Sequence, residues 1–107
     1  NEPNANGTEV YYADSNNGNA YGTTSEKLAT NILNRMLYYM GSTNRGVKTA
    51  EHAVTKRCEM PAALTEVGFI TNPTEVYNMT TDEYQYKAAQ GIAEGIMITL
   101  KDINVPQ

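Results

Sequence analysis

The chain has 107 residues, enough for one small domain or a piece of one, and this length excludes two domains. Its net charge is −4 at pH 7 and it contains no run of Lys and Arg, so we expect no nucleic-acid partner. No apolar segment reaches the ~20 residues that cross a bilayer, and we expect no membrane span. The one cysteine, Cys58, cannot form an internal disulfide.

Residues 7–12, GTEVYY, predict a short β-strand. Alternation places Val10 and Tyr12 on one face of this strand. Glu9 and Tyr11 then lie on the other face. A polar loop rich in Gly and Asn follows and ends the strand.

Residues 23–41 predict an amphipathic helix. Its apolar side chains recur at helical spacing: Leu28, Ile32, Met36 and Met40, backed by Ala29, Leu33 and Leu37. Thr23 and Glu26 have the spacing of a capping box, which favours a helix start at this point. Gly41 stands where a left-handed residue commonly ends a helix.

The middle of the chain has weaker patterns. Residues 43–48, TNRGVK, are interpreted as a basic turn, and residues 49–59 fit either a strand or an extended loop. Residues 62–70, AALTEVGFI, form a largely uncharged run of strand length, typical of a strand buried on both faces in a parallel sheet. Glu66 would lie near the C-terminal end of that strand.

Two more helices are predicted after this run. Asn72 is a plausible N-cap with Pro73 at the first helical position, which favours a short helix. Thr80 and Glu83 open the last helix, whose predicted apolar stripe comprises Tyr84, Ala88, Ile92, Ile96 and Leu100. Gly91 and Gly95 in that helix favour close packing against a neighbour. With the short helix left out, the order of strand, helix, strand, strand and helix indicates an α/β fold.

Glu66 is the one carboxylate in the run from Met60 to Ile70. Its desolvation is costly unless another group compensates the charge. In open α/β sheets, functional groups collect beyond the carboxyl ends of the strands, which favours a functional role. The residues also allow a structural role, in which Glu66 binds a helix N-terminus or pairs with Arg45 or Lys48. The pattern leaves both interpretations open.

Four segments, in this order, resemble the C-terminal part of zinc-dependent N-acetylmuramoyl-L-alanine amidases of the type 3 class. They are GTEVYY, NRGVK, MPAALTEVGFITNPTE and AQGIAEGI, and together they cover nearly the whole chain. The segment around Glu66 is the most specific of the four. These enzymes are cell-wall hydrolases found among bacterial autolysins, sporulation and germination enzymes, and phage endolysins.

The resemblance implies a zinc hydrolase that cuts the amide between N-acetylmuramic acid and the L-alanine of the stem peptide in peptidoglycan. Glu66 matches the general base that takes a proton from the zinc-bound water and passes it to the leaving amine. The implied fold is the C-terminal portion of an open α/β sheet with helices on both faces. The implied location is extracellular, in the bacterial cell envelope, or in a phage endolysin.

The family's zinc ligands, a His, a Glu and a second His, precede the strand that GTEVYY matches, and none of their motifs is in this chain. Residues 1–107 are therefore expected to be the C-terminal part of one amidase catalytic domain, with zinc held by residues outside this chain. The missing N-terminal part of the domain would be the partner of this part, and the chain alone is predicted to be inactive.

The remaining candidates have plainer interpretations. His52 and Cys58 are expected to be structural and inert, since catalytic zinc normally takes three protein ligands and these two residues lack a third. Arg45 is a candidate for binding a carboxylate of the stem peptide, although surface cations are more often only solvated. Two alternatives to the amidase remain open: a non-catalytic module that binds cell wall or a partner protein, and another zinc peptidase.

Overall fold

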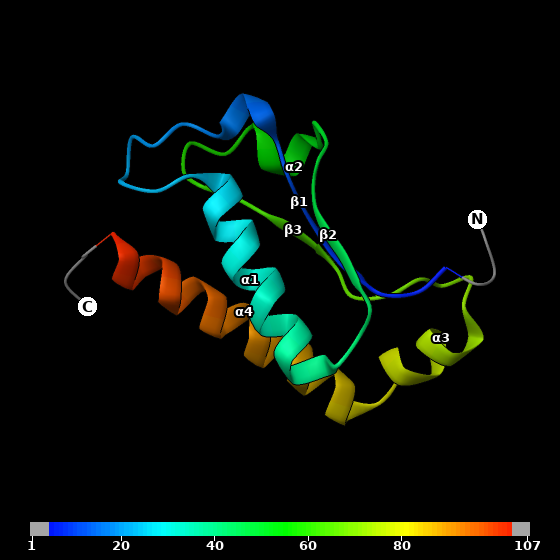
Figure 1. The fold of residues 1–107 in the computed structure, drawn as a ribbon. Helices are drawn as coiled ribbons and strands as arrows, with labels where there is room; N and C mark the ends of the chain where they lie inside the picture. Colours follow the sequence, from blue (N-terminus) through cyan, green and yellow to red (C-terminus); the bar gives the residue numbers. More distant parts are fainter. Residues whose placement is uncertain (1–4, 104–107) are drawn as a thin grey trace.

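The computed structural model describes residues 5–103 of the chain (Figure 1). Its elements, in chain order, are β1 (Thr8–Tyr12), the short 3-10 helix η1 (Asp14–Asn16), α1 (Ser25–Met40), β2 (Asn44–Thr49), α2 (Ala53–Lys56), β3 (Leu64–Glu66), α3 (Pro73–Met79) and α4 (Asp82–Asp102). The predicted α/β class, a sheet flanked by helices, is confirmed. Residues 1–4 and 104–107 lie outside the described residues.

The sheet has the strand order β2-β1-β3, in which β1 runs parallel to β2 and antiparallel to β3. The prediction of a parallel strand buried on both faces at residues 62–70 is wrong. Only Leu64–Glu66 form a strand, and none of these three residues is buried. The run is apolar because Ala63 and Val67, on either side of the strand, pack against the core on one face.

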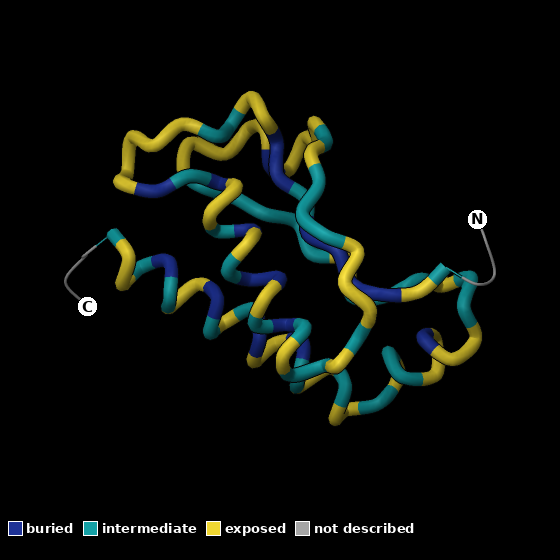
Figure 2. Tube along the Cα trace, viewed as in Figure 1, coloured by how far each residue is buried: buried dark blue, intermediate teal, exposed yellow. Residues whose placement is uncertain are grey.

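The core lies between β1 and the helices α1 and α4. Val10 and Tyr12 are buried on the face of β1 that meets α1, as the alternation of GTEVYY predicts. Figure 2 shows buried positions along β1, α1 and α4. The apolar face of α1 is confirmed, since the helix buries Ala29, Ile32, Leu33 and Met36.

The ends of α1 agree closely with the sequence. Gly41 ends the helix in the left-handed conformation, with a φ of 65°. The N-cap is Thr24 rather than Thr23, and the Thr24 hydroxyl accepts a hydrogen bond of 3.1 Å from the Lys27 N–H. The last helix is likewise capped one residue later than predicted, by Thr81.

Helices α1 and α4 lie side by side (Figure 1), and two glycines bring their backbones together. A Cβ added at Gly91 would stand 2.5 Å from the Met36 Cα, and one at Gly95 would stand 2.5 Å from the Ile32 Cα. The predicted role of these glycines in close packing is confirmed. The predicted stripe of α4 is rotated toward them, because the helix buries Ala88, Gly91, Gly95 and Thr99, while Ile96 is 41% exposed.

Two middle segments differ from the sequence prediction. The predicted basic turn at residues 43–48 is largely the strand β2. This segment is a strand because its backbone pairs with β1. Residues 49–59 form neither a strand nor only an extended loop, because they contain the single helical turn α2. Within residues 5–103, no helix is both long and apolar enough to span a membrane.

Candidate functional site

One face of the sheet, opposite α1, gathers the charged residues of the three strands. The register pairs Glu9 with Glu66, and it pairs Tyr11 with Lys48 on one side and with Leu64 on the other. Since paired residues project to the same face of a sheet, these side chains share one surface. We call Glu9, Tyr11, Arg45, Lys48 and Glu66 the polar face.

Glu66 lies at the C-terminal end of β3 and is exposed. The expectation of a desolvated carboxylate is therefore wrong for this structure, because one face of the short antiparallel strand is open. The structural alternatives are also not seen: no ion pair in the described part of the chain involves Glu66, and Asn72 caps the nearest helix N-terminus. Glu66 is thus an accessible carboxylate without a fixed partner cation.

Glu9, directly opposite Glu66, is only 2% exposed. Its Oε1 atom accepts a hydrogen bond of 2.9 Å from the Arg45 Nε and one of 3.3 Å from the Lys48 Nζ. Burial raises the pKa of Glu9, but hydrogen bonds from Tyr11, Arg45 and Lys48 outweigh burial and lower that pKa below its ordinary value. The predicted cations of Glu66 are therefore the partners of Glu9.

The pKa of Tyr11 also responds to the negative charge of Glu9. Its hydrogen bond to Glu9, together with its burial and the charges of Glu9 and Glu66, raises the pKa of Tyr11 to about 12. The hydroxyl therefore stays protonated and donates to the Glu9 carboxylate. The polar face is a connected set in which one buried carboxylate has a hydroxyl and two cations as partners.

Arg45, the predicted substrate-binding residue, is fixed in two ways. Its Nε donates to Glu9, and its guanidinium carbon lies 4.6 Å from the centroid of the Phe69 ring. The side chain remains 34% exposed. Arg45 therefore combines a held guanidinium with access from solvent.

Glu75 is a buried carboxylate whose role the sequence prediction missed. Its two oxygens accept hydrogen bonds from the Gly7 N–H at 2.7 Å and from the Phe69 N–H at 2.8 Å. It therefore ties the start of α3 to the entrance of β1 and to the segment that follows Glu66. The available signal was an acidic residue in the first turn after Asn72 and Pro73, which indicated only a helix start.

His52 and Cys58 lie at the surface near α2, as expected for structural residues. The His52 ring meets the Tyr11 ring edge-on at 5.3 Å, and the Cys58 thiol donates a 3.0 Å hydrogen bond to the Val54 carbonyl. Across residues 5–103, no group of three His, Cys, Asp or Glu side chains is placed to hold a metal ion. These residues therefore do not by themselves fit a catalytic zinc, which needs three protein ligands.

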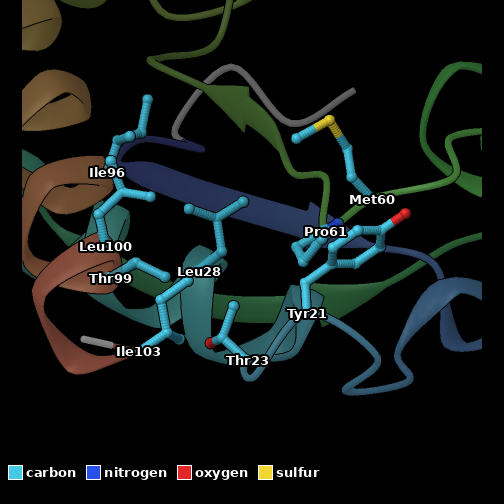
Figure 3. Close-up of a pocket in the computed structure, with 9 residues that line it drawn as sticks. All are labelled: Tyr21, Thr23, Leu28, Met60, Pro61, Ile96, Thr99, Leu100 and Ile103. Carbon is cyan, nitrogen blue, oxygen red and sulfur yellow. The ribbon is translucent and has the colours of Figure 1, made fainter. Parts of the chain in front are cut away.

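A cavity of about 390 Å³ lies away from the polar face, between the start of α1 and the end of α4 (Figure 3). Its lining is almost wholly apolar and comes from these two helices and the loops beside them: Tyr21, Thr23, Leu28, Met60, Pro61, Ile96, Thr99, Leu100 and Ile103. The Thr23 hydroxyl is buried there without a hydrogen-bond partner among the residues described. The cavity contains no carboxylate and offers no hydrolytic chemistry.

Residues 1–97 match the family model described as N-acetylmuramoyl-L-alanine amidase. The chain is 37% identical over 90 residues to the N-acetylmuramoyl-L-alanine amidase LytC of Bacillus subtilis, covering 84% of this chain and 17% of that protein. It is 35% identical over 95 residues to the endolysin of Bacillus phage SPP1, covering 88% and 35% of the two chains.

The fold has solved counterparts. The catalytic domain of CwlV, an N-acetylmuramoyl-L-alanine amidase from Bacillus (Paenibacillus) polymyxa var. colistinus, superposes with a TM-score of 0.80 at 32% identity. That match covers 94% of this chain and 51% of the CwlV domain. The chain thus spans about half the length of this solved domain, and less of LytC and the endolysin.

Proposed function

Because the chain belongs to the N-acetylmuramoyl-L-alanine amidase family, we propose that it is the C-terminal part of a catalytic domain that hydrolyses peptidoglycan. The bond cut would be the amide between N-acetylmuramic acid and the L-alanine of the stem peptide. The observation that carries this proposal is the exposed Glu66 carboxylate at the end of β3, within the matched residues.

Glu66 is proposed as the general base. A carboxylate that takes a proton from an attacking water and gives it to the leaving amine must come within hydrogen-bond reach of both, and a cation paired with it would compete for that role. Glu66 is accessible to such a water, since it is exposed, and Glu9 holds the cations Arg45 and Lys48. Glu9 is buried and doubly paired, so it is unsuited to the same task.

Zinc is proposed as the cofactor, held by residues outside this chain, because residues 5–103 provide no three-ligand group. When bound, zinc supplies a water whose pKa is lowered toward ~7. This proposal also makes the chain alone inactive. Its partner would be the N-terminal part of the same domain.

Arg45 is proposed to bind a carboxylate of the stem peptide. Its guanidinium is held by Glu9 and Phe69 and remains partly exposed on the same face as Glu66. The similarity to LytC and to the endolysin supports a location outside the bacterial cytoplasm, in the cell envelope, or in a phage lysis system.

The test is product analysis with the complete amidase domain that contains this chain. We expect zinc-dependent release of L-alanine amino termini from muramyl-peptide, and we expect this release to be lost in Glu66→Gln but kept in Glu59→Gln, a matched change at an exposed glutamate. New amino termini other than L-alanine would instead indicate another zinc peptidase. Binding of cell wall without any hydrolysis would indicate the non-catalytic module.

A further inference from the structure

We propose that a β-bulge in β2, the buried Glu9 and the Phe69 ring together orient Arg45, so that the amidase selects stem peptides that carry a free carboxylate. This inference rests on the proposed function and deepens it. It makes Arg45 the specificity-determining residue, and it makes Glu9, Gly46 and Phe69 positioning residues.

The bulge is visible in the register between β1 and β2. Thr8 pairs with Asn44, but Glu9 pairs with Gly46, so Arg45 is the extra residue without a partner on β1. Gly46 has a φ of +89°, a conformation that side chains rarely adopt, and the Asn44 Oδ1 accepts a 2.8 Å hydrogen bond from the Gly46 N–H. Bulges of this kind re-aim a side chain beside a site.

Glu9 has a second cation besides Arg45. Lys48 stands in regular register opposite Tyr11 and reaches the same Glu9 oxygen at 3.3 Å. A buried carboxylate with one cation and a tyrosine hydroxyl is already satisfied. The bulge, with Gly46 at a positive φ, places Arg45 beside Glu9 as a further cation.

Two contacts fix the guanidinium while its tip stays free. The hydrogen bond to Glu9 uses the Nε, and the guanidinium carbon lies over the Phe69 ring, 4.6 Å from its centroid. Among the described residues, no hydrogen bond or ion pair of the Arg45 Nη groups is seen. Two Nη groups held in one orientation match the two oxygens of a carboxylate.

The charges favour an anionic partner at Arg45. Arg45 and Lys48 carry two positive charges against the single negative charge of Glu9, so these three residues keep one positive charge at the surface. Glu66, across from Glu9, repels an anion at its own end of the face. A substrate carboxylate is therefore directed to Arg45, while the amide to be cut is left for Glu66.

The test compares two muramyl-peptides, one with free carboxylates on the stem and one with the same carboxylates amidated, as substrates of the complete zinc-loaded domain. We expect the wild type to prefer the free form and Arg45→Ala to lose that preference by ~10-fold or more, mainly through KM. Arg57→Ala, a change at an exposed cation outside the polar face, serves as the control and keeps the preference.

The positioning residues are tested with paired variants. Phe69→Leu removes the ring, and we expect it to raise KM for the free form while kcat is kept. Phe69→Tyr keeps the ring, and we expect its KM to stay close to that of the wild type. Glu9→Gln shifts KM in the same direction as Phe69→Leu. If the Glu9 variant fails to fold, the Phe69 pair still decides the question.

Failure of the inference and failure of the proposed function give different results. Turnover with an unchanged preference in Arg45→Ala overturns the inference alone. If the domain shows no turnover, calorimetric binding of the same two muramyl-peptides still tests the inference: preferential binding of the free form that depends on Arg45 supports it, and equal binding of the two forms overturns it.

Discussion

Two carboxylates face each other across β1 and β3, and their surroundings suit them to different tasks. Glu9 is 2% exposed and bound by a tyrosine and two cations, whereas Glu66 is exposed and free of ion pairs within residues 5–103. A buried and fully paired carboxylate organises its neighbours, because leaving it unpaired would cost several kcal/mol. An exposed carboxylate at a strand end can exchange protons with a substrate.

Tyr11 provides a probe of this arrangement. Its pKa is raised to about 12, first by the hydrogen bond to Glu9. We predict that Glu9→Gln lowers the pKa of Tyr11 toward its ordinary value of 10.0, because the negative acceptor is lost. The measurement is the tyrosinate absorbance titration, with the Tyr11→Phe spectrum subtracted to isolate this residue. An unchanged pKa would show that Glu9 is not its partner.

At the scale of elements, the α1–α4 contact depends on two glycines. We predict that Gly95→Ala destabilises the domain by ~1–3 kcal/mol, since the added Cβ would lie 2.5 Å from the Ile32 Cα. Helix propensity alone would favour alanine by ~1 kcal/mol, so the sign of the effect separates packing from propensity. Denaturant unfolding measures it.

The matched control is Gly18→Ala, because a Cβ at Gly18 meets no atom within 4 Å. Its free energy of unfolding is expected to stay close to that of the wild type. Equal effects at positions 18 and 95 would contradict the close approach of the two helices.

The elements that the sequence predicts well have local signals. Helix α1 has an apolar period and Gly41, and α3 has Asn72 and Pro73. The segment that contains β2 reads as a turn, because its charged residues and glycine become a strand only by pairing with β1. The four-residue α2 is too short for any period, and no local pattern sets the antiparallel direction of β3.

The candidate site also contains residues that local sequence indicates and residues that only the tertiary fold reveals. Glu66 and Arg45 are candidates because they lie in segments that resemble a family; the family itself is confirmed, and the roles of the two residues stay predictions. The burial of Glu9 was not predicted, because its cations lie 36 and 39 residues away in the chain. The bonds of Glu75 to Gly7 and Phe69 were missed for the same reason, since only the tertiary fold brings them together.

At the scale of the whole molecule, the lowered pKa of Glu9 links stability to pH. A carboxylate whose folded-state pKa lies below its ordinary value of 4.5 stabilises the fold at pH values above 4.5. This contribution is lost as pH falls through the folded-state pKa. We predict that the wild type has a higher free energy of unfolding than Glu9→Gln at neutral pH. The difference between the two proteins is expected to shrink as pH falls below about 4.5. Parallel curves over the acid range would contradict this linkage.

Among the described strands, β2 and β3 each pair only with β1, so each leaves one edge open. Open edges favour association with another chain. We predict that the 107-residue chain alone self-associates or unfolds with low cooperativity, as measured by light scattering and denaturant unfolding. A cooperative monomer with protected edge amides in hydrogen exchange would contradict this expectation.

We propose Glu66 as the general base of a peptidoglycan amidase. Its most direct test is the turnover of muramyl-peptide by the complete domain with Glu66→Ala, with zinc content measured on the same samples. If Glu66 is the base and not a ligand, zinc stays bound while turnover falls by ~10²–10⁴. Turnover close to that of the wild type, or loss of zinc from the variant, would contradict it.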